Sequence, residues 1–210
     1  MKKYTADALV KQSRHYNYFQ TLDESTKNDV LERIGVLIKE EREYCDKGNY
    51  KHLANLLTAL SLYETLQKHG MTEEDAFKTV GEEMFKSVQP TKEKFQKMSQ
   101  KSWFWTVIKK IVPIGFKKGS GAGWRYTWFK GQPKNEFRFE TNECIYAKIF
   151  KKRGLEKLGP LFCQCDVINY GELDGIDFKR TKTLCYGDEK CDFMFVKHPK
   201  GESFERSKSK

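Results

Sequence analysis

The chain has 210 residues, enough for one large domain or for a domain with a helical extension, and 38% of them are hydrophobic. Fifteen Phe, ten Tyr and four Trp can build a core or line a pocket, which excludes a disordered chain. The formal charge of +10 comes from 39 basic and 29 acidic residues. Because basic and acidic residues interleave, as at Lys39–Glu43, we interpret them as solvated helix faces and expect no nucleic-acid partner.

The N-terminal residues do not predict a secretory signal, because Met1-Lys2-Lys3 is followed by polar residues. The most apolar run, 103–116, contains Lys109 and Lys110 and is shorter than the roughly 20 residues that span a bilayer. We therefore expect a cytoplasmic protein with no membrane span. Its cysteines should then be reduced thiols. They lie at positions 45, 144, 163, 165, 185 and 191.

The first half of the chain predicts a succession of helices. Apolar residues recur at helical spacing over 27–44 and over 50–69, and Gly70 marks the end of the second stretch. Thr72, followed by three acidic residues, predicts another helix start. Pro90-Thr91 predicts a break and a further start.

The run 103–116 predicts a fifth helix that bends or ends near Pro113. We favour a helix packed on the core; the alternative is an amphipathic anchor on a membrane surface. The glycine-rich segment 119–123 lacks the preceding strand and the glycine spacing of a dinucleotide-binding fingerprint. We expect it to be a flexible crossing between a helical region, 1–118, and an α+β region, 119–196.

The second half predicts strands and short helices. Alternating apolar and charged residues predict a strand over 136–141. Asn142 can cap a helix that runs through Lys152, and a second helix is expected over about 160–170.

The last part of the chain predicts a hairpin. A long strand over 176–186, a loop at 187–190 and a partner strand over 191–196 complete a small antiparallel sheet. The predicted fold class is α+β, with the N-terminal helical region packed on this sheet as one domain. A basic, flexible tail is expected at 197–210.

Arg180 is the first residue that points to chemistry. Period two on the predicted strand places it on the face of Ile176 and Phe178, where a cation needs an anion. Two interpretations stay open: a salt bridge to a nearby Asp, or a bidentate clamp on a substrate carboxylate.

Cys163, Asp166 and Tyr170 would share one face of the second predicted helix. A thiol beside a carboxylate and a phenol can act as a nucleophile or activate water, and a thiolate would need a nearby cation such as Arg180. A buried structural thiol is the slightly favoured alternative for Cys163, whereas for Asp166 we favour a functional role.

Cys191 and Asp192 lie at the start of the returning strand. Cys191 would share a face with Phe193 and Phe195, and a small core thiol is favoured over catalysis there. Asp192 points the other way, where it could pair with Thr183 or Arg180.

A zinc site is the remaining alternative for the cysteines. Cys163, Cys165, Cys185 and Cys191 could offer four thiolates. The spacing of the first two is C-x-C, not the more diagnostic C-x-x-C, and the last two are too far apart for a standard knuckle. We expect no cofactor, with zinc at Cys163, Cys185 and Cys191 as the alternative.

Several motifs, in their order and spacing, resemble those of a known family. They are Thr141–Cys144, Tyr146, Gly154, Cys163, Asp166, Arg180–Leu184, Gly187 and Cys191–Phe193. The pattern over 136–196 resembles the L-2-amino-thiazoline-4-carboxylic acid hydrolase family, and the stretch from His52 to Ala76 is similar more weakly. The C-terminal unit also resembles the 4-vinyl reductase ligand-sensing domain, which can hold zinc. Thr183 stands where that domain would have a cysteine, which argues against carrying the zinc over.

The resemblance implies a hydrolase that opens the ring of L-2-amino-thiazoline-4-carboxylate to a carbamoyl-cysteine, on a route to L-cysteine. Asp166 would activate water and polarise the amidine, Arg180 would hold the carboxylate, and Thr183 and Tyr170 would donate hydrogen bonds. Cys163 is a candidate covalent nucleophile. The candidate catalytic residues are Asp166, Cys163 and Thr183, and the candidate substrate-binding residues are Arg180, Tyr170, Cys144, Asp192 and Cys191.

Two other functions stay open: a small-molecule binding or sensing module without catalysis, and a related hydrolase with a different cyclic amide or amidine substrate. The expected partner is a small-molecule substrate. Whether the chain forms a homo-oligomer is left open.

Overall fold

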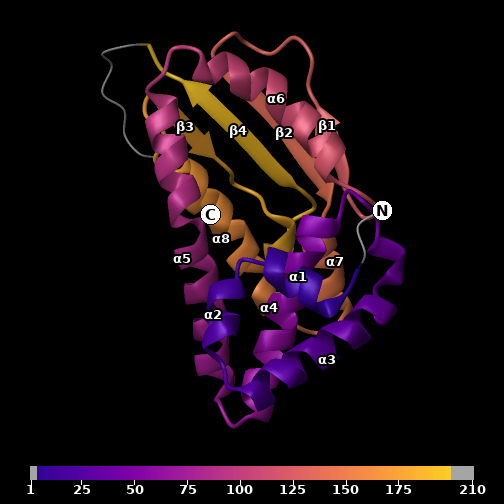
Figure 1. The fold of residues 1–210 in the computed structure, drawn as a ribbon. Coiled ribbons are helices and arrows are strands. Elements are labelled where there is room, and N and C mark those ends of the chain that lie inside the picture. The colour runs from indigo at the N-terminus through magenta and orange to yellow at the C-terminus, as the bar shows by residue number, and fades with distance from the viewer. Residues whose placement is uncertain (1–3, 200–210) are drawn as a thin grey trace. The chain divides into compact units, whose positions relative to one another are not determined.

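The computed structural model describes residues 4–199, so most of the predicted tail at 197–210 lies outside the described residues. The described chain divides into two compact units. Figure 1 labels their helices and strands. The first runs up to Ser87 and includes Lys118–Ala122; the second comprises Val88–Lys117 and the chain from Gly123 onward. Every candidate site residue belongs to the second unit. No helix of the described part is both long and apolar enough to cross a membrane.

The first unit is helical, and its two long helices confirm the sequence prediction. Helix α3 begins one residue after Asp23, whose carboxylate accepts the Thr26 N–H at 3.0 Å as an N-cap. In α4 most side chains are buried, so its apolar stripe is a core stripe. The helices are α1 (Ala6–Gln12), α2 (Tyr16–Thr21), α3 (Glu24–Glu40), the 3₁₀ turn η1 (Arg42–Tyr44), α4 (Tyr50–Lys68) and the first part of α5 (Glu73–Ser99).

The glycine-rich segment at 119–123 is anchored within the first unit, which corrects the prediction of a flexible crossing. Asp46 accepts the Ala122 N–H at 2.7 Å, and Asn49 donates to the Ala122 carbonyl at 2.9 Å. A Cβ at Gly121 would lie 1.9 Å from an Asp46 carboxylate oxygen, so only glycine fits this close approach.

The predicted break at Pro90-Thr91 is wrong, because α5 continues through Pro90 to Ser99. Proline removes one helical hydrogen bond and crowds the preceding turn. Both residues are exposed, and burial of Val88 before them and packing of Phe95 after them offset that cost. Helix α6 (Phe104–Gly119) likewise continues through Pro113.

The second unit contains a four-stranded antiparallel sheet in the order β1-β2-β4-β3, which confirms the α+β class. Its strands are β1 (Arg125–Trp128), β2 (Glu136–Glu143), β3 (Ile176–Lys179) and β4 (Cys191–Lys197). Strand β1 was not predicted. The register pairs Phe137 with Phe195 and Phe139 with Phe193, so successive aromatic residues line one face.

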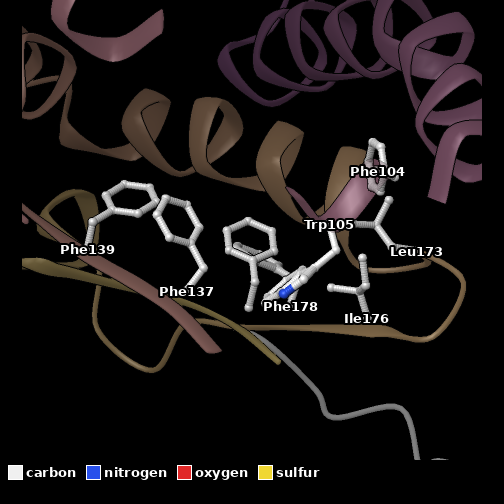
Figure 2. Packing of buried hydrophobic residues seen from close by; sticks show 8 residues of the cluster. Phe104, Trp105, Phe137, Phe139, Leu173, Ile176 and Phe178 are labelled. Atoms are coloured by element: carbon white, nitrogen blue, oxygen red, sulfur yellow. The ribbon is translucent and has the colours of Figure 1, made fainter. Parts of the chain in front are cut away.

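That aromatic face carries the core of the second unit. Figure 2 shows Phe137, Phe139 and Phe178 from the sheet in a row, with Trp105 reaching toward them from α6. The Trp105 indole N–H donates to the Lys134 carbonyl at 3.0 Å, which satisfies its polar edge. The favoured interpretation of the 103–116 run as a core-packing helix is thereby confirmed.

Two short helices follow β2. Helix α8 (Gly159–Tyr170) confirms the prediction, but α7 spans Ile145–Lys152, and its N-cap is Cys144 rather than Asn142. Strand β2 continues to Glu143, so the chain is still extended at the expected cap. The start of α7 three residues later puts a thiol, not an amide, at the helix N-terminus.

Candidate active site

The segment after β3 leaves the sheet at Arg180, so the predicted long strand over 176–186 is wrong. The Asp192 carboxylate accepts the Thr181 and Lys182 N–H groups at 2.8 and 2.6 Å and the Thr181 hydroxyl at 2.6 Å. The Asp188 carboxylate accepts the Thr183 N–H at 2.7 Å. These carboxylates accept the backbone N–H groups that would otherwise bond to a neighbouring strand. The chain then turns into η3 (Leu184–Tyr186).

Asp192 is therefore the residue that shapes this loop. The prediction that it pairs with Thr183 or Arg180 is wrong, because its oxygens are taken up by Thr181 and the Lys182 N–H. The loop that it holds carries Arg180, Thr183 and Cys185 toward α8 and α7.

Arg180 is buried, with a side chain that is 1% exposed. One guanidinium nitrogen donates to Asp166 at 2.9 Å and another to the Cys163 carbonyl at 3.0 Å. The guanidinium also lies 5.7 Å from the Phe178 ring and 5.3 Å from the Phe193 ring. Of the two interpretations offered for Arg180, the salt bridge to an Asp is the one that the structure shows.

Cys144 lies where the extended chain of β2 turns into α7. Its sulfur makes no strict capping hydrogen bond, but the N–H groups of Ala147 and Tyr146 interact favourably with it. Burial raises the pKa of the Cys144 thiol, whereas a hydrogen bond from the Cys185 thiol and these two N–H groups lower it, and the net pKa lies below the usual value. The first turn of α7 thus favours a thiolate at Cys144.

Cys185 brings the cysteines together in what we call the thiol cluster: Cys144, Cys163, Cys185 and Cys191. The Cys185 thiol is hydrogen-bonded to Cys144 and to Cys163, and these contacts, together with burial, hold its pKa well above the usual value. Cys185 is therefore a protonated thiol that can donate. Burial raises the pKa of Cys191 to about 12, with the nearby Cys144 and Cys163 adding to it. None of the six cysteines forms a disulfide.

Gly159, the first residue of α8, makes room for Cys185. A Cβ at Gly159 would lie 2.9 Å from the Cys185 Cβ and 3.0 Å from its sulfur. Any side chain at this position would displace Cys185 and change the thiol contacts. The sequence pattern did not single out Gly159, and it offered Cys185 only as a possible zinc ligand.

Asp166 and Thr183 add polar groups to the cluster. The charge of Asp166 raises the pKa of Cys144 and so opposes the donors that lower it, and the Asp166 side chain is 37% exposed, so solvent reaches the site at this carboxylate. Thr183 is 1% exposed, and its hydroxyl has no hydrogen-bond partner among the described residues. A buried hydroxyl without a partner is costly, so it is a donor that a bound molecule or water could use.

Two other predicted residues lie elsewhere in the second unit. The Tyr170 ring packs in the aromatic core, 5.5 Å from Phe95, 5.7 Å from Phe178 and 5.6 Å from Phe195. Cys165 is fully buried, and its sulfur donates to the Leu161 carbonyl at 3.5 Å. The predicted shared face of α8 therefore holds for Cys163 and Asp166, which Arg180 bridges, while the ring of Tyr170 belongs to the core.

Within residues 4–199, no group of three or more His, Cys, Asp or Glu side chains is arranged to hold a metal ion. The second unit has a hollow of about 530 Å³ at the sheet, lined by Glu136, Arg138, Glu140 and Met194 among others. No cysteine lines it. Two of its carboxylates are ion-paired, Glu136 with Arg138 and Glu140 with Lys190. The thiol cluster, with its lowered Cys144 pKa, is the better candidate for chemistry.

Comparison with known proteins adds one finding. A family model described as L-2-amino-thiazoline-4-carboxylic acid hydrolase matches residues 50–195, which is more than half of the chain. Searches of curated proteins and of solved structures find no match. The matched range contains the whole thiol cluster, Asp166 and Arg180.

Proposed function

Because the chain belongs to the L-2-amino-thiazoline-4-carboxylic acid hydrolase family, we propose that it opens the ring of a small cyclic amidine acid such as L-2-amino-thiazoline-4-carboxylate. The observation that carries the proposal is the setting of Cys144. Its sulfur lies at the N-terminus of α7 and beside the protonated Cys185 thiol, and these donors lower its pKa below the usual value although burial and the Asp166 carboxylate oppose them.

The first step of the proposed reaction is attack of the Cys144 thiolate on the amidine carbon between ring sulfur and ring nitrogen. Asp166 pairs with the amidine in its protonated form and so keeps it protonated, which makes that carbon more electrophilic. The carbon–sulfur bond of the ring then breaks, and the ring sulfur leaves as a thiolate. The Cys185 thiol, which its surroundings keep protonated, supplies a proton to this leaving group.

The second step releases the enzyme. Water attacks the isothiourea carbon now bonded to Cys144, and Asp166, which is reached by solvent, accepts a proton from it. The bond from carbon to the Cys144 sulfur breaks, and the product carries the water oxygen as a carbamoyl group. The net reaction adds one water to the substrate.

Arg180 acts through Asp166 in this scheme and is a positioning residue. Its buried guanidinium fixes the carboxylate at 2.9 Å and anchors the α8 backbone at the Cys163 carbonyl. Thr183 contributes a buried hydroxyl that can donate to the substrate. Cys163, the first candidate for the nucleophile, instead contacts the donor thiol of Cys185.

The test is turnover of L-2-amino-thiazoline-4-carboxylate by the purified chain, followed by mass spectrometry. We expect a product that is heavier than the substrate by one water. The rate should fall at least about a hundredfold in Cys144→Ser, because a hydroxyl in this setting is a far weaker nucleophile. Acid quenching during turnover should trap a protein heavier by one intact substrate, with the added mass on the peptide that contains Cys144.

The matched control is Cys45→Ser, a change to a partly exposed thiol of the first unit that should leave the rate unchanged. Equal activity of Cys144→Ser and wild type would contradict the covalent step. Loss of turnover in Asp166→Asn, with Cys144→Ser active, would point to water activation by the carboxylate. A substrate that returns unchanged from the wild-type chain would refute hydrolysis of this ring.

A further inference from the structure

The positive charge of this protein is concentrated in one segment. Residues 94–135 contain ten basic residues and no acidic one, whereas the rest of the chain has 29 basic and 29 acidic residues. The whole formal charge of +10 therefore belongs to the segment that contains α6. A field of this kind attracts anionic surfaces.

Helix α6 is apolar on two opposite faces. Its inner face places Trp105, Ile108, Val112 and Phe116 against the aromatic core. Figure 1 shows α6 running beside the strands of the sheet, along the outside of the second unit. A helix that only served the core would be polar on the face turned away from it.

The outer face of α6 carries large apolar side chains in solvent. Trp103 is 48% exposed, Ile111 57% and Ile114 54%. Trp103 directly precedes α6, and its carbonyl accepts the Val107 N–H at 3.1 Å; the spacing of 103, 107, 111 and 114 therefore places all four on one side. Exposed apolar side chains gathered on one helix face indicate an interaction surface.

Lysines border this apolar stripe. Lys110, Lys117 and Lys118 are exposed on α6, and Lys101 is exposed just before it. Among the described residues, no carboxylate is ion-paired with any of these four. Tryptophan and isoleucine flanked by unpaired lysines match the interface of an anionic bilayer, where apolar side chains enter the acyl boundary and lysines meet the headgroups.

We infer that the outer face of α6 docks this protein on an anionic lipid surface, with α6 parallel to the membrane plane. The exposed apolar stripe favours lipid over nucleic acid, because a duplex would engage the lysines and leave three large apolar side chains in water. The inference is independent of the proposed hydrolase activity, since none of these residues belongs to the thiol cluster.

The test is sedimentation of the full chain with vesicles of phosphatidylcholine alone or mixed equally with phosphatidylglycerol. We expect binding to the anionic vesicles, little binding to the neutral ones, and weakening at high salt. The triple variant Lys110→Glu, Lys117→Glu, Lys118→Glu should lose at least about a hundredfold in affinity. The double variant Ile111→Ser, Ile114→Ser should lose roughly tenfold or more.

A control with the same change in net charge distinguishes an effect of this surface on vesicle binding from an effect of net charge alone. Lys39→Glu, Lys47→Glu, Lys51→Glu changes three exposed lysines of the first unit and should retain vesicle binding within a few-fold. Equal loss in both triple variants, or full retention in the isoleucine variant, would overturn the proposed surface. Binding to duplex DNA in place of vesicles would overturn the lipid assignment.

Discussion

At the scale of single residues, the candidate site depends on how one thiol is surrounded. Cys144 is buried, which alone would disfavour its charged form, yet the start of α7 and the Cys185 thiol reverse the balance. Cys191, also buried, has no such donors beyond the Leu184 N–H, and its pKa rises to about 12. The pKa values of these two buried cysteines therefore shift in opposite directions because their hydrogen-bond donors differ.

Alkylation by iodoacetamide as a function of pH measures this difference. Cys144 should reach half of its maximal rate below pH 9, because its pKa lies below the usual value and the thiolate is the reactive form. Cys45 serves as the comparison. Burial raises the pKa of its thiol, so the midpoint of its alkylation profile should lie above pH 9. Peptide mapping by mass spectrometry gives both profiles in one experiment. Coincident midpoints for the two cysteines would contradict an activated Cys144.

At the scale of elements, the site is made where α7, α8 and the loop after β3 meet. The loop is held by two carboxylates, Asp192 and Asp188, that accept backbone N–H groups in place of a neighbouring strand. The start of α8 approaches η3 so closely that Gly159 has no room for a side chain. Packing between these elements, not their individual propensities, brings Cys185 to Cys144 and Cys163.

Replacing Gly159 by Ala tests this packing. The backbone of Gly159 is helical, so alanine should gain from helix propensity, but its Cβ would clash with the Cys185 Cβ. We expect a net loss of about 1–3 kcal/mol in the free energy of unfolding and a rise in the alkylation midpoint of Cys144. Urea titration followed by circular dichroism measures the stability.

The control for this prediction is Gly35→Ala in α3, where a Cβ would meet nothing within 4 Å. That variant should be more stable than wild type by up to about 1 kcal/mol. If Gly159→Ala were stabilised to the same degree, with an unchanged midpoint for Cys144, the close approach of α8 to Cys185 would not exist in solution.

At the scale of the whole molecule, stability toward acid should depend on His15 in the first unit. His15 is fully buried; its Nε2–H donates to the Val80 carbonyl at 2.9 Å, and its Nδ1 has no donor or acceptor among the described residues. Burial lowers its pKa to about 4 from the usual 6.5. Below pH 6.5 the unfolded chain therefore binds a proton that the folded chain does not, and the folded state loses stability as the pH falls to about 4.

The expected loss between pH 7 and pH 4 is about 3 kcal/mol from this residue. Urea denaturation at several pH values measures it. His15→Gln keeps a donor for the Val80 carbonyl and cannot titrate, so its stability should depend less steeply on pH over this window. An identical dependence for wild type and His15→Gln would show that other groups govern the response to acid.

Local patterns were sufficient for much of this molecule. The helical stripes predicted α3 and α4, and the alternation at Phe137 and Phe139 predicted a strand, because these patterns reflect which side of an element is buried. The argument that Arg180 needs an anion also held, since burial of a cation is costly wherever it occurs. The motif spacing was enough to identify the family.

Other features depended on residues far apart in the chain. Arg180 leaves the sheet because Asp192, twelve positions later, takes the adjacent N–H groups, and no local propensity encodes that competition. Cys185 reaches Cys144 from a segment some forty residues later, and the close approach of α8 to it requires a glycine at position 159. Helix α5 passes Pro90 because packing on both sides of it outweighs one lost hydrogen bond. Secondary structure and family follow from short-range pattern, whereas the neighbours of the Cys144 thiol reach it only once the tertiary fold has brought distant segments into contact.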